Sequence, residues 1–192
     1  MAARELRPLL RGGAFFEGPR WREGRWWVSD FYRRTVSTVT PEGVEEEVLT
    51  VQGQPSGLGW MPDGSLLVVS RKDFRLLRRS PEGELGGHAD LSRLAKGHLN
   101  DMVVDAQGRA YVGNFGFDLM VRADPSPTEL VRVDPDGSVT VVADELWFPN
   151  GTVISPDGGT LIVGETVAAR YTAFTVAAVS YTHLTLPTTP YV

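Results

Sequence analysis

Cysteine is absent from this 192-residue sequence, and histidine occurs only three times. The absence of cysteine excludes a disulfide framework, a thiolate metal site and a cysteine nucleophile. It leaves the redox compartment open, so a cytoplasmic location is only the default expectation. No serine lies in a G-x-S-x-G motif, and the scattered His88, His98 and His183 give no support to a Ser-His-Asp triad.

Positive charge is not in excess, since 19 Lys and Arg against 24 Asp and Glu give a net charge of -5. A general nucleic-acid binder needs a basic surface that neutralises phosphates, so we expect no nucleic-acid partner. The exception is one basic run, which we assign to the solvated side of two outer strands: Arg71, Lys72, Arg75, Arg78 and Arg79. No apolar run has the length of a signal peptide or a membrane span, so neither export nor a membrane partner has support.

Helical periodicity is nearly absent, and the only candidate for a helical turn is 91–95. Instead, short runs rich in β-branched and aromatic residues predict strands. These runs are 26–28, 35–39, 66–69, 102–104, 110–112, 130–133, 139–142 and 161–163. With 42% hydrophobic and 22% charged residues, the composition is typical of a globular chain rather than a disordered one.

Tight turns recur along the whole pattern and end in glycine, which accepts the positive φ that such turns need. The turn glycines are Gly24, Gly43, Gly64, Gly83, Gly108, Gly137 and Gly158. Two hairpins therefore form a unit that repeats every 40 to 54 residues. Four short strands per unit are typical of a propeller blade. A β-sandwich also spaces its turns regularly, but it would not place equivalent polar residues at the same point of every second hairpin.

The predicted fold is thus all-β, a β-propeller in which seven hairpins make about three and a half blades. We expect a lead-in at 1–14 and a partial propeller at 15–178. The long insertion at 117–128 is either a lid over a central site or an ordinary solvated loop.

The end of the sequence has a different texture. Asp, Glu, Lys and Arg do not occur from residue 171 to residue 192, and the upstream type of turn signal stops. The string at 180–190 resembles the adapter-like or frameshifted ends of truncated reading frames. We therefore expect 179–192 to be a foreign tail.

Four oxygen-bearing side chains share one position in the repeat: Glu17, Ser56, Asn100 and Asn150. Each lies eight residues before a turn glycine, or seven in the first, shorter turn. Because the first strand of each blade faces the channel of a propeller, these side chains should approach one point. Hard oxygen ligands favour Ca²⁺ over zinc or copper, and over Mg²⁺ less clearly.

Each residue of this set also has a local explanation. Asn150 precedes a glycine as in common turns, Glu17 can be a solvated acid, and Asn100 can bond the neighbouring backbone. The shared register favours a common site for these three, whereas Ser56 can simply stabilise a turn.

The motifs around these residues resemble the SMP-30/gluconolactonase/regucalcin family from about residue 15 to residue 176. They are Phe16-Glu17-Gly18-Pro19-Arg20-Trp21, Pro55-Ser56-Gly57, Asn100-Asp101, Phe148-Pro149-Asn150-Gly151 and Pro156-Asp157-Gly158. Phosphotriesterase-like and strictosidine-synthase-like propellers share parts of this set.

The resemblance implies a six-bladed propeller that hydrolyses sugar lactones with a central divalent cation, commonly calcium, with zinc also accepted. It implies that Glu17 and Asn150 bind the metal directly, and that Asn100 lies beside the metal and contacts water or substrate. The family's remaining metal-binding Asp, often proposed as the general base, belongs to a later motif that we expect beyond residue 192. The catalytic residue is therefore unassigned, and we expect this chain by itself to be a poor or inactive enzyme.

His98 stands where the family often has an arginine that contacts substrate hydroxyls. A lone histidine is more often a loop residue, although its neutral ring can still hydrogen-bond a sugar. The sequence thus favours a fragment of a metal-dependent lactonase that acts on a small lactone or ester. Two alternatives stay open, an arylesterase or phosphotriesterase-like hydrolase on the same propeller and a non-catalytic scaffold with a structural metal.

Overall fold

The computed structural model of this chain describes residues 6–176 and 183–185, and within them the backbone forms four antiparallel sheets of four strands each. The first sheet contains β1 (Phe16–Arg22), β2 (Arg25–Asp30), β3 (Thr35–Val39) and β4 (Glu45–Thr50). The second contains β5 (Pro55–Trp60), β6 (Leu66–Ser70), β7 (Arg75–Arg79) and β8 (Leu85–Asp90). The third contains β9 (Leu99–Val104), β10 (Ala110–Asn114), β11 (Thr128–Val133) and β12 (Val139–Leu146). The fourth contains β13 (Pro149–Ile154), β14 (Thr160–Glu165), β15 (Arg170–Thr175) and β16 (His183–Thr185).

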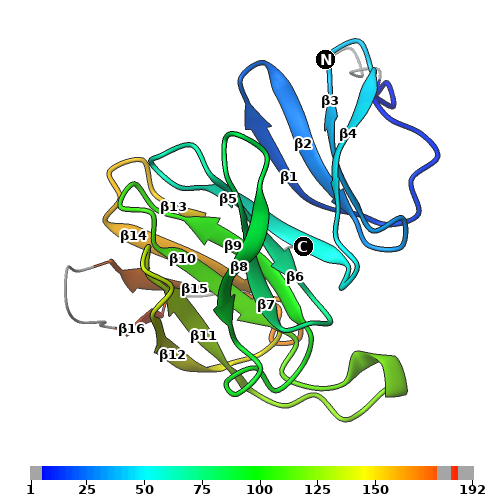
Figure 1. Cartoon of the computed structure of the whole chain (residues 1–192). Coiled ribbons are helices and arrows are strands. Elements are labelled where there is room, and N and C mark those ends of the chain that lie inside the picture. The colour runs from blue at the N-terminus through cyan, green and yellow to red at the C-terminus, as the bar shows by residue number, and fades with distance from the viewer. Residues whose placement is uncertain (1–5, 177–182, 186–192) are drawn as a thin grey trace, which may run out of the picture.

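The four sheets follow one another in chain order, as the blades of a propeller do (Figure 1). The first strand of each sheet is the inner one, because β5 packs against β1 and β9, and β9 packs against β13. The predicted all-β propeller class is therefore confirmed. All eight predicted strand runs lie inside strands of these sheets.

Strand β6 shows why the sheets stack. Its side chains alternate in direction, so Leu66 and Val68 join an apolar cluster with Val36 of the first sheet. Leu67 and Val69 point the other way and join a cluster with residues of the third sheet. Burying an aliphatic side chain of this size contributes about 1.5–3 kcal/mol, so a blade inside the stack is stabilised from both faces.

The blade count differs from the prediction, because four sheets are present rather than about three and a half. The fourth sheet is completed by β16, which pairs with β15 through Thr172 and Thr185 and the two pairs that follow. No turn signal precedes β16 in the sequence, so only backbone pairing reveals it. Residues 177–182 and 186–192 lie outside the described residues, and the assignment of 179–192 to a foreign tail stays a prediction.

Helical structure is minor. At the predicted turn 91–95, the carbonyl of Leu91 accepts the N–H groups of Leu94 and Ala95, both at 3.0 Å, without forming a helix. A 3-10 helix, η1 (Leu119–Val121), lies instead in the insertion at 117–128, where the Asp118 side chain caps it. Among the described residues, no helix has the length and apolar character that crossing a membrane requires.

Candidate functional site

All four inner strands are interrupted at the same point by one extra residue. In β1 the irregularity lies between Glu17 and Arg20. Its equivalents lie between Pro55 and Leu58, between Leu99 and Met102, and between Asn150 and Thr152. The four residues that share the repeat position, Glu17, Ser56, Asn100 and Asn150, lie in or beside these bulges. Because bulges redirect side chains and are common beside functional sites, the shared sequence position corresponds to a shared backbone feature.

Glu17 and Asn150 are each followed by a glycine in the left-handed conformation. The φ angle is 54° at Gly18 and 56° at Gly151. The Asn150 Oδ1 accepts the Gly151 N–H at 3.0 Å, and the Gly18 N–H likewise donates to the Glu17 carboxylate. Both side chains are half-buried. The turned backbone therefore fixes one oxygen and leaves part of each side chain available to a ligand.

Ser56 and Asn100 are held differently, because they are only 1% and 2% exposed. The Asn100 Nδ2 donates to the Pro149 carbonyl at 3.1 Å and so joins the third blade to the residue before Asn150. The Ser56 Oγ has no hydrogen-bond partner within the described part of the chain. A buried hydroxyl without a partner is unfavourable, and a ligand at this point would satisfy it.

Asp101 of the third blade acts on Glu17 of the first blade. The Arg20 Nη2 donates to Asp101 Oδ1 at 2.8 Å and to the Met102 carbonyl at 2.7 Å, so a side chain of the first blade reaches the third. The Thr152 N–H of the fourth blade donates to Asp101 Oδ2 at 3.4 Å. Burial raises the pKa of Glu17, and the negative charge of Asp101 raises it further. The sequence motif contained Asp101 but gave no hint of this cross-blade role.

Acidic residues at two second-strand ends hold the segments that lead into the inner strands. The Ala14 N–H donates to Asp30 Oδ2 at 2.7 Å, and the Trp147 N–H donates to Glu165 Oε2 at 2.8 Å. Each of these N–H groups lies three residues before a predicted metal ligand. Although burial acts to raise the pKa of Asp30, the backbone N–H groups that it accepts hold that pKa below its ordinary value. In the first and in the fourth blade, an ionised carboxylate thus fixes the backbone segment that precedes the predicted metal ligand.

His98, the other predicted substrate-binding residue, lies among aromatic rings. Its ring centroid is 5.9 Å from that of Phe74 and 6.3 Å from that of Phe115. Burial lowers the pKa of His98, and the positive charge of Arg71 lowers it further, so the ring is neutral near pH 7. Within the described residues its Nδ1 has no hydrogen-bond partner. Binding of substrate by His98 stays a prediction.

The assignment of the basic run to a solvated face is wrong for Arg71. This residue is 3% exposed, and its guanidinium carbon lies 4.6 Å from the Phe31 ring centroid and 5.6 Å from that of Phe115. By contrast, Arg75 is exposed, as expected. The two rings come from the neighbouring blades, so the local charge pattern could not reveal the burial of Arg71.

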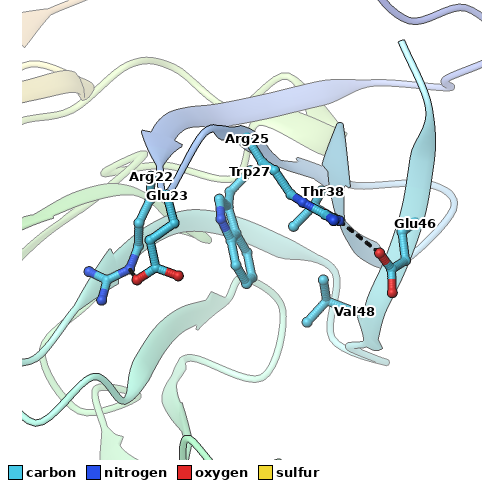
Figure 2. Close-up of a pocket in the computed structure, with 7 residues that line it drawn as sticks. All are labelled: Arg22, Glu23, Arg25, Trp27, Thr38, Glu46 and Val48. Carbon is cyan, nitrogen blue, oxygen red and sulfur yellow. Dashed lines mark hydrogen bonds and ion pairs between the residues drawn. The ribbon is translucent and has the colours of Figure 1, made fainter. Parts of the chain in front are cut away.

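A hollow of about 260 Å³ lies elsewhere, on the first sheet. Figure 2 shows its lining residues, Arg22, Glu23, Arg25, Trp27, Thr38, Glu46 and Val48. Arg25 pairs with Glu46 at 2.8 Å, and Arg22 pairs with Glu23 at 3.1 Å. None of the predicted site residues lines this hollow, and its charges neutralise one another, so we do not place the site there.

The predicted metal site has few of the side chains that usually bind metal ions, such as carboxylates and imidazoles. Residues 6–176 and 183–185 contain no group of three or more His, Cys, Asp or Glu side chains that could hold a metal ion. The predicted set has one carboxylate, Glu17, and otherwise amide and hydroxyl oxygens, which are ligands that calcium accepts. The unpartnered Ser56 hydroxyl and the raised pKa of Glu17 are compatible with a cation at this point. Convergence of these oxygens on one ion stays a prediction.

One protein-family model matches most of the chain. The family model described as the SMP-30/Gluconolactonase/LRE-like region matches residues 15–184. No curated protein matches the chain.

Three solved structures show the same fold. A gluconolactonase from Xanthomonas campestris is 24% identical, with a TM-score of 0.75 over 93% of this chain and 65% of that one. The calcium-binding protein regucalcin from Agrobacterium tumefaciens is 24% identical, with a TM-score of 0.71 over 86% of this chain and 55% of that one. A luciferin-regenerating enzyme is 16% identical, with a TM-score of 0.75 over 91% and 61%. The chain therefore spans less than two thirds of the length of each of these proteins.

Proposed function

Because this chain belongs to the SMP-30/Gluconolactonase/LRE-like family, we propose that it is part of a hydrolase that opens the ring ester of small-molecule lactones. The observation that supports the proposal is the bulge repeated in all four inner strands, since four oxygen-bearing residues lie in or beside it at equivalent positions. The gluconolactonase among the similar structures supports a sugar lactone as the substrate.

We propose that Glu17 and Asn150 would hold a divalent cation directly and that Asn100 would lie beside it. Calcium is favoured because the donors are hard oxygens, and Zn²⁺ and Mg²⁺ are the alternatives. When bound, such a cation supplies Lewis acidity that polarises an ester carbonyl.

The chain's own groups would orient and bind the substrate. Asn100 is fixed by its bond to the Pro149 carbonyl, so its amide oxygen stays free to accept a hydrogen bond from water or a substrate hydroxyl. The neutral His98 ring can hydrogen-bond a substrate oxygen through its unpartnered Nδ1 or the opposite nitrogen, depending on the tautomer. Asp101 is engaged by Arg20 and Thr152, so we give it a positioning role and leave the general base unassigned.

A second candidate is hydrolysis of aryl esters, which the aromatic surroundings favour. The ring centroids of Phe115 and Phe148 are 4.6 Å apart, and those of Phe15 and Phe31 are 5.1 Å apart. These residues flank the bulges, and stacking on them would bind an aromatic leaving group better than a sugar ring.

The test compares Asn150→Ala with the unchanged chain in calcium titration and in turnover of glucono-δ-lactone and phenyl acetate. We expect calcium affinity to fall by roughly tenfold, with any turnover falling in parallel. The melting temperature should hardly change, because the side chain of Asn150 bonds only its neighbour among the residues that the structure describes. Gln52→Ala, at an exposed amide on the first blade, is the matched control. Unchanged calcium affinity in Asn150→Ala would refute the metal role, and any turnover that persists in Asn150→Ala while calcium affinity falls would separate the metal from catalysis.

A further inference from the structure

A second set of equivalent positions lies just outside the bulges, two residues before each predicted site residue. There the carbonyl groups of Phe15, Gln54, His98 and Phe148 accept the N–H groups of Phe31, Arg71, Phe115 and Thr166, respectively. The four distances are 3.0, 2.9, 2.9 and 3.0 Å. Every blade thus contributes one backbone rung at the same level. Of the eight residues in these rungs, Arg71 is the only one with a permanent charge.

Aromatic rings surround this charge. Phe15 stacks on Phe31 at 5.1 Å, the Arg71 guanidinium lies over Phe31 and Phe115, and Phe115 contacts Phe148 at 4.6 Å. The rings of the first, third and fourth blades thus form an aromatic belt, in which the guanidinium of Arg71 occupies the place of the second blade. Such a belt offers large apolar faces but few groups that could bind the hydroxyls of a sugar.

The hydrogen bonds that Arg71 makes leave part of its guanidinium unused. Its Nη2 donates to the Gln54 side-chain oxygen, which is neutral. Its Nε is buried and has no hydrogen-bond partner within the described residues. No carboxylate among them lies within salt-bridge distance of Arg71, although the charge of Glu17 acts on it from further away. A buried guanidinium normally pairs with a carboxylate or phosphate, which its planar set of donors matches.

Binding of a cation by Glu17 would remove the remaining negative charge that balances Arg71. The guanidinium would then lie unpaired beside the proposed metal, in surroundings where an unpaired charge is unfavourable. An anionic group on the bound molecule would restore the balance. A neutral lactone would not.

We propose that Arg71 is a specificity-determining residue that selects lactones carrying a carboxylate group. This inference rests on the proposed function, since it names the substrate class of the same site. The lactone body would lie against the aromatic belt, and the carboxylate would accept hydrogen bonds from the guanidinium. The exposed Arg75, in the same basic run, has no such role.

The test uses two ligands of nearly the same shape, the anionic 5-oxotetrahydrofuran-2-carboxylate and the corresponding neutral carboxamide. Dissociation constants are measured by calorimetry on the full chain with a chelator present, so a metal ion cannot hold the carboxylate. The Glu17→Gln background is included because the Glu17 charge would oppose an anion. In that background we expect the carboxylate to bind about tenfold more tightly than the carboxamide, as one charged hydrogen bond provides.

Arg71→Met should abolish the preference, Arg71→Lys should retain part of it, and the control Arg75→Met should leave it unchanged. Circular dichroism establishes that each variant is folded. Equal affinity for the two ligands in the Glu17→Gln chain overturns the proposal without any change at Arg71. A preference for the carboxylate that survives Arg71→Met also overturns the proposal. If Arg71→Met with Glu17 intact then binds calcium more tightly than the unchanged chain, Arg71 is a counter-charge for Glu17. Because these measurements require no turnover, they are separate from the test of lactone hydrolysis.

Discussion

The first and fourth blades present their site residues, whereas the second and third blades bury theirs. Glu17 and Asn150 are half-buried and precede left-handed glycines, and their side-chain oxygens accept the next backbone N–H. Ser56 and Asn100 occupy the same bulge but are almost fully buried. Equivalent positions of the repeat are thus half-buried and available to a ligand in two blades, and buried within the fold in the other two.

The glycine after the site position has different surroundings in the second and fourth blades. Gly57 allows β5 to approach β9, because a Cβ at this position would lie 2.4 Å from the Met102 nitrogen. At Gly151 an added Cβ would meet nothing within 4 Å, and the glycine is needed for its backbone angle instead. The second blade therefore uses this position for packing, whereas the fourth blade uses it to turn the backbone beside Asn150.

The largest effect should come from Gly57→Ala. The added methyl group would collide with backbone rather than with a flexible side chain, so we expect a loss of about 3 kcal/mol in the free energy of unfolding. Urea denaturation measures this loss. Gly87→Ala is the control, because a Cβ there has nothing within 4 Å and the strand conformation is ordinary. Equal stability of the two variants would show that the close approach of β5 to β9 is not required.

Asn100→Ala should be the next most damaging change. It leaves the Pro149 carbonyl without its buried donor, so we expect a loss of about 2 kcal/mol. Asn150→Ala should cost far less stability, because its amide contributes only a local bond. Thermal melting of both variants side by side measures the two losses of stability. A larger loss for Asn150→Ala would show that the buried amide of Asn100 is not the more important of the two for the fold.

Gly151→Ala should cost about 1–2 kcal/mol, the strain of a left-handed alanine. The alanine side chain has room, so the loss reflects backbone conformation alone. Gly151→Asn provides the comparison, because asparagine adopts this conformation more readily and should restore part of the stability. Denaturation curves that place the two variants at the same stability would contradict the conformational explanation.

The smallest effect concerns pH. Because the pKa of Glu17 is raised above 4.5, the folded protein binds more protons than the unfolded chain between 4.5 and the raised value. The stability of the calcium-free protein should therefore fall as pH rises through that window. Asp101→Asn removes the second cause of the shift and should reduce this fall. Urea titrations at several pH values across the window measure this fall in stability. Glu17→Gln is the control, because it lacks the Glu17 contribution. A fall of unchanged size in Asp101→Asn would show that the charge of Asp101 does not act on Glu17.

The repeat, and the equivalent position of one polar residue in each inner strand, could be predicted from sequence, because glycine turns and the polar residues before them are local signals. The outer strands β4 and β8 could not, since Glu45–Thr50 is rich in glutamate and Leu85–Asp90 contains two adjacent glycines. Neither pattern is typical of strands, and pairing with β3 and β7 determines their conformation.

Within the site, the sequence identified the oxygen donors but missed the groups that act across blades. Arg71 lies in a run of basic residues, and its burial depends on rings about 40 positions away in either direction along the chain. Asp101 is bonded by residues of the first and fourth blades. Such contacts depend on how the blades stack, which the turn pattern does not specify.

A crystal structure of the chain grown with calcium would show whether the four bulges form one cation site. We expect an ion at the inner strand ends, with oxygens of Glu17 and Asn150 at about 2.3–2.6 Å and Asn100 beside them. The same ion should be lost in Glu17→Gln and kept in Glu23→Gln, whose carboxylate lies in an exposed turn. Calcium bound elsewhere, or an ion at this site that survives Glu17→Gln, would show that the bulges do not form a cation site.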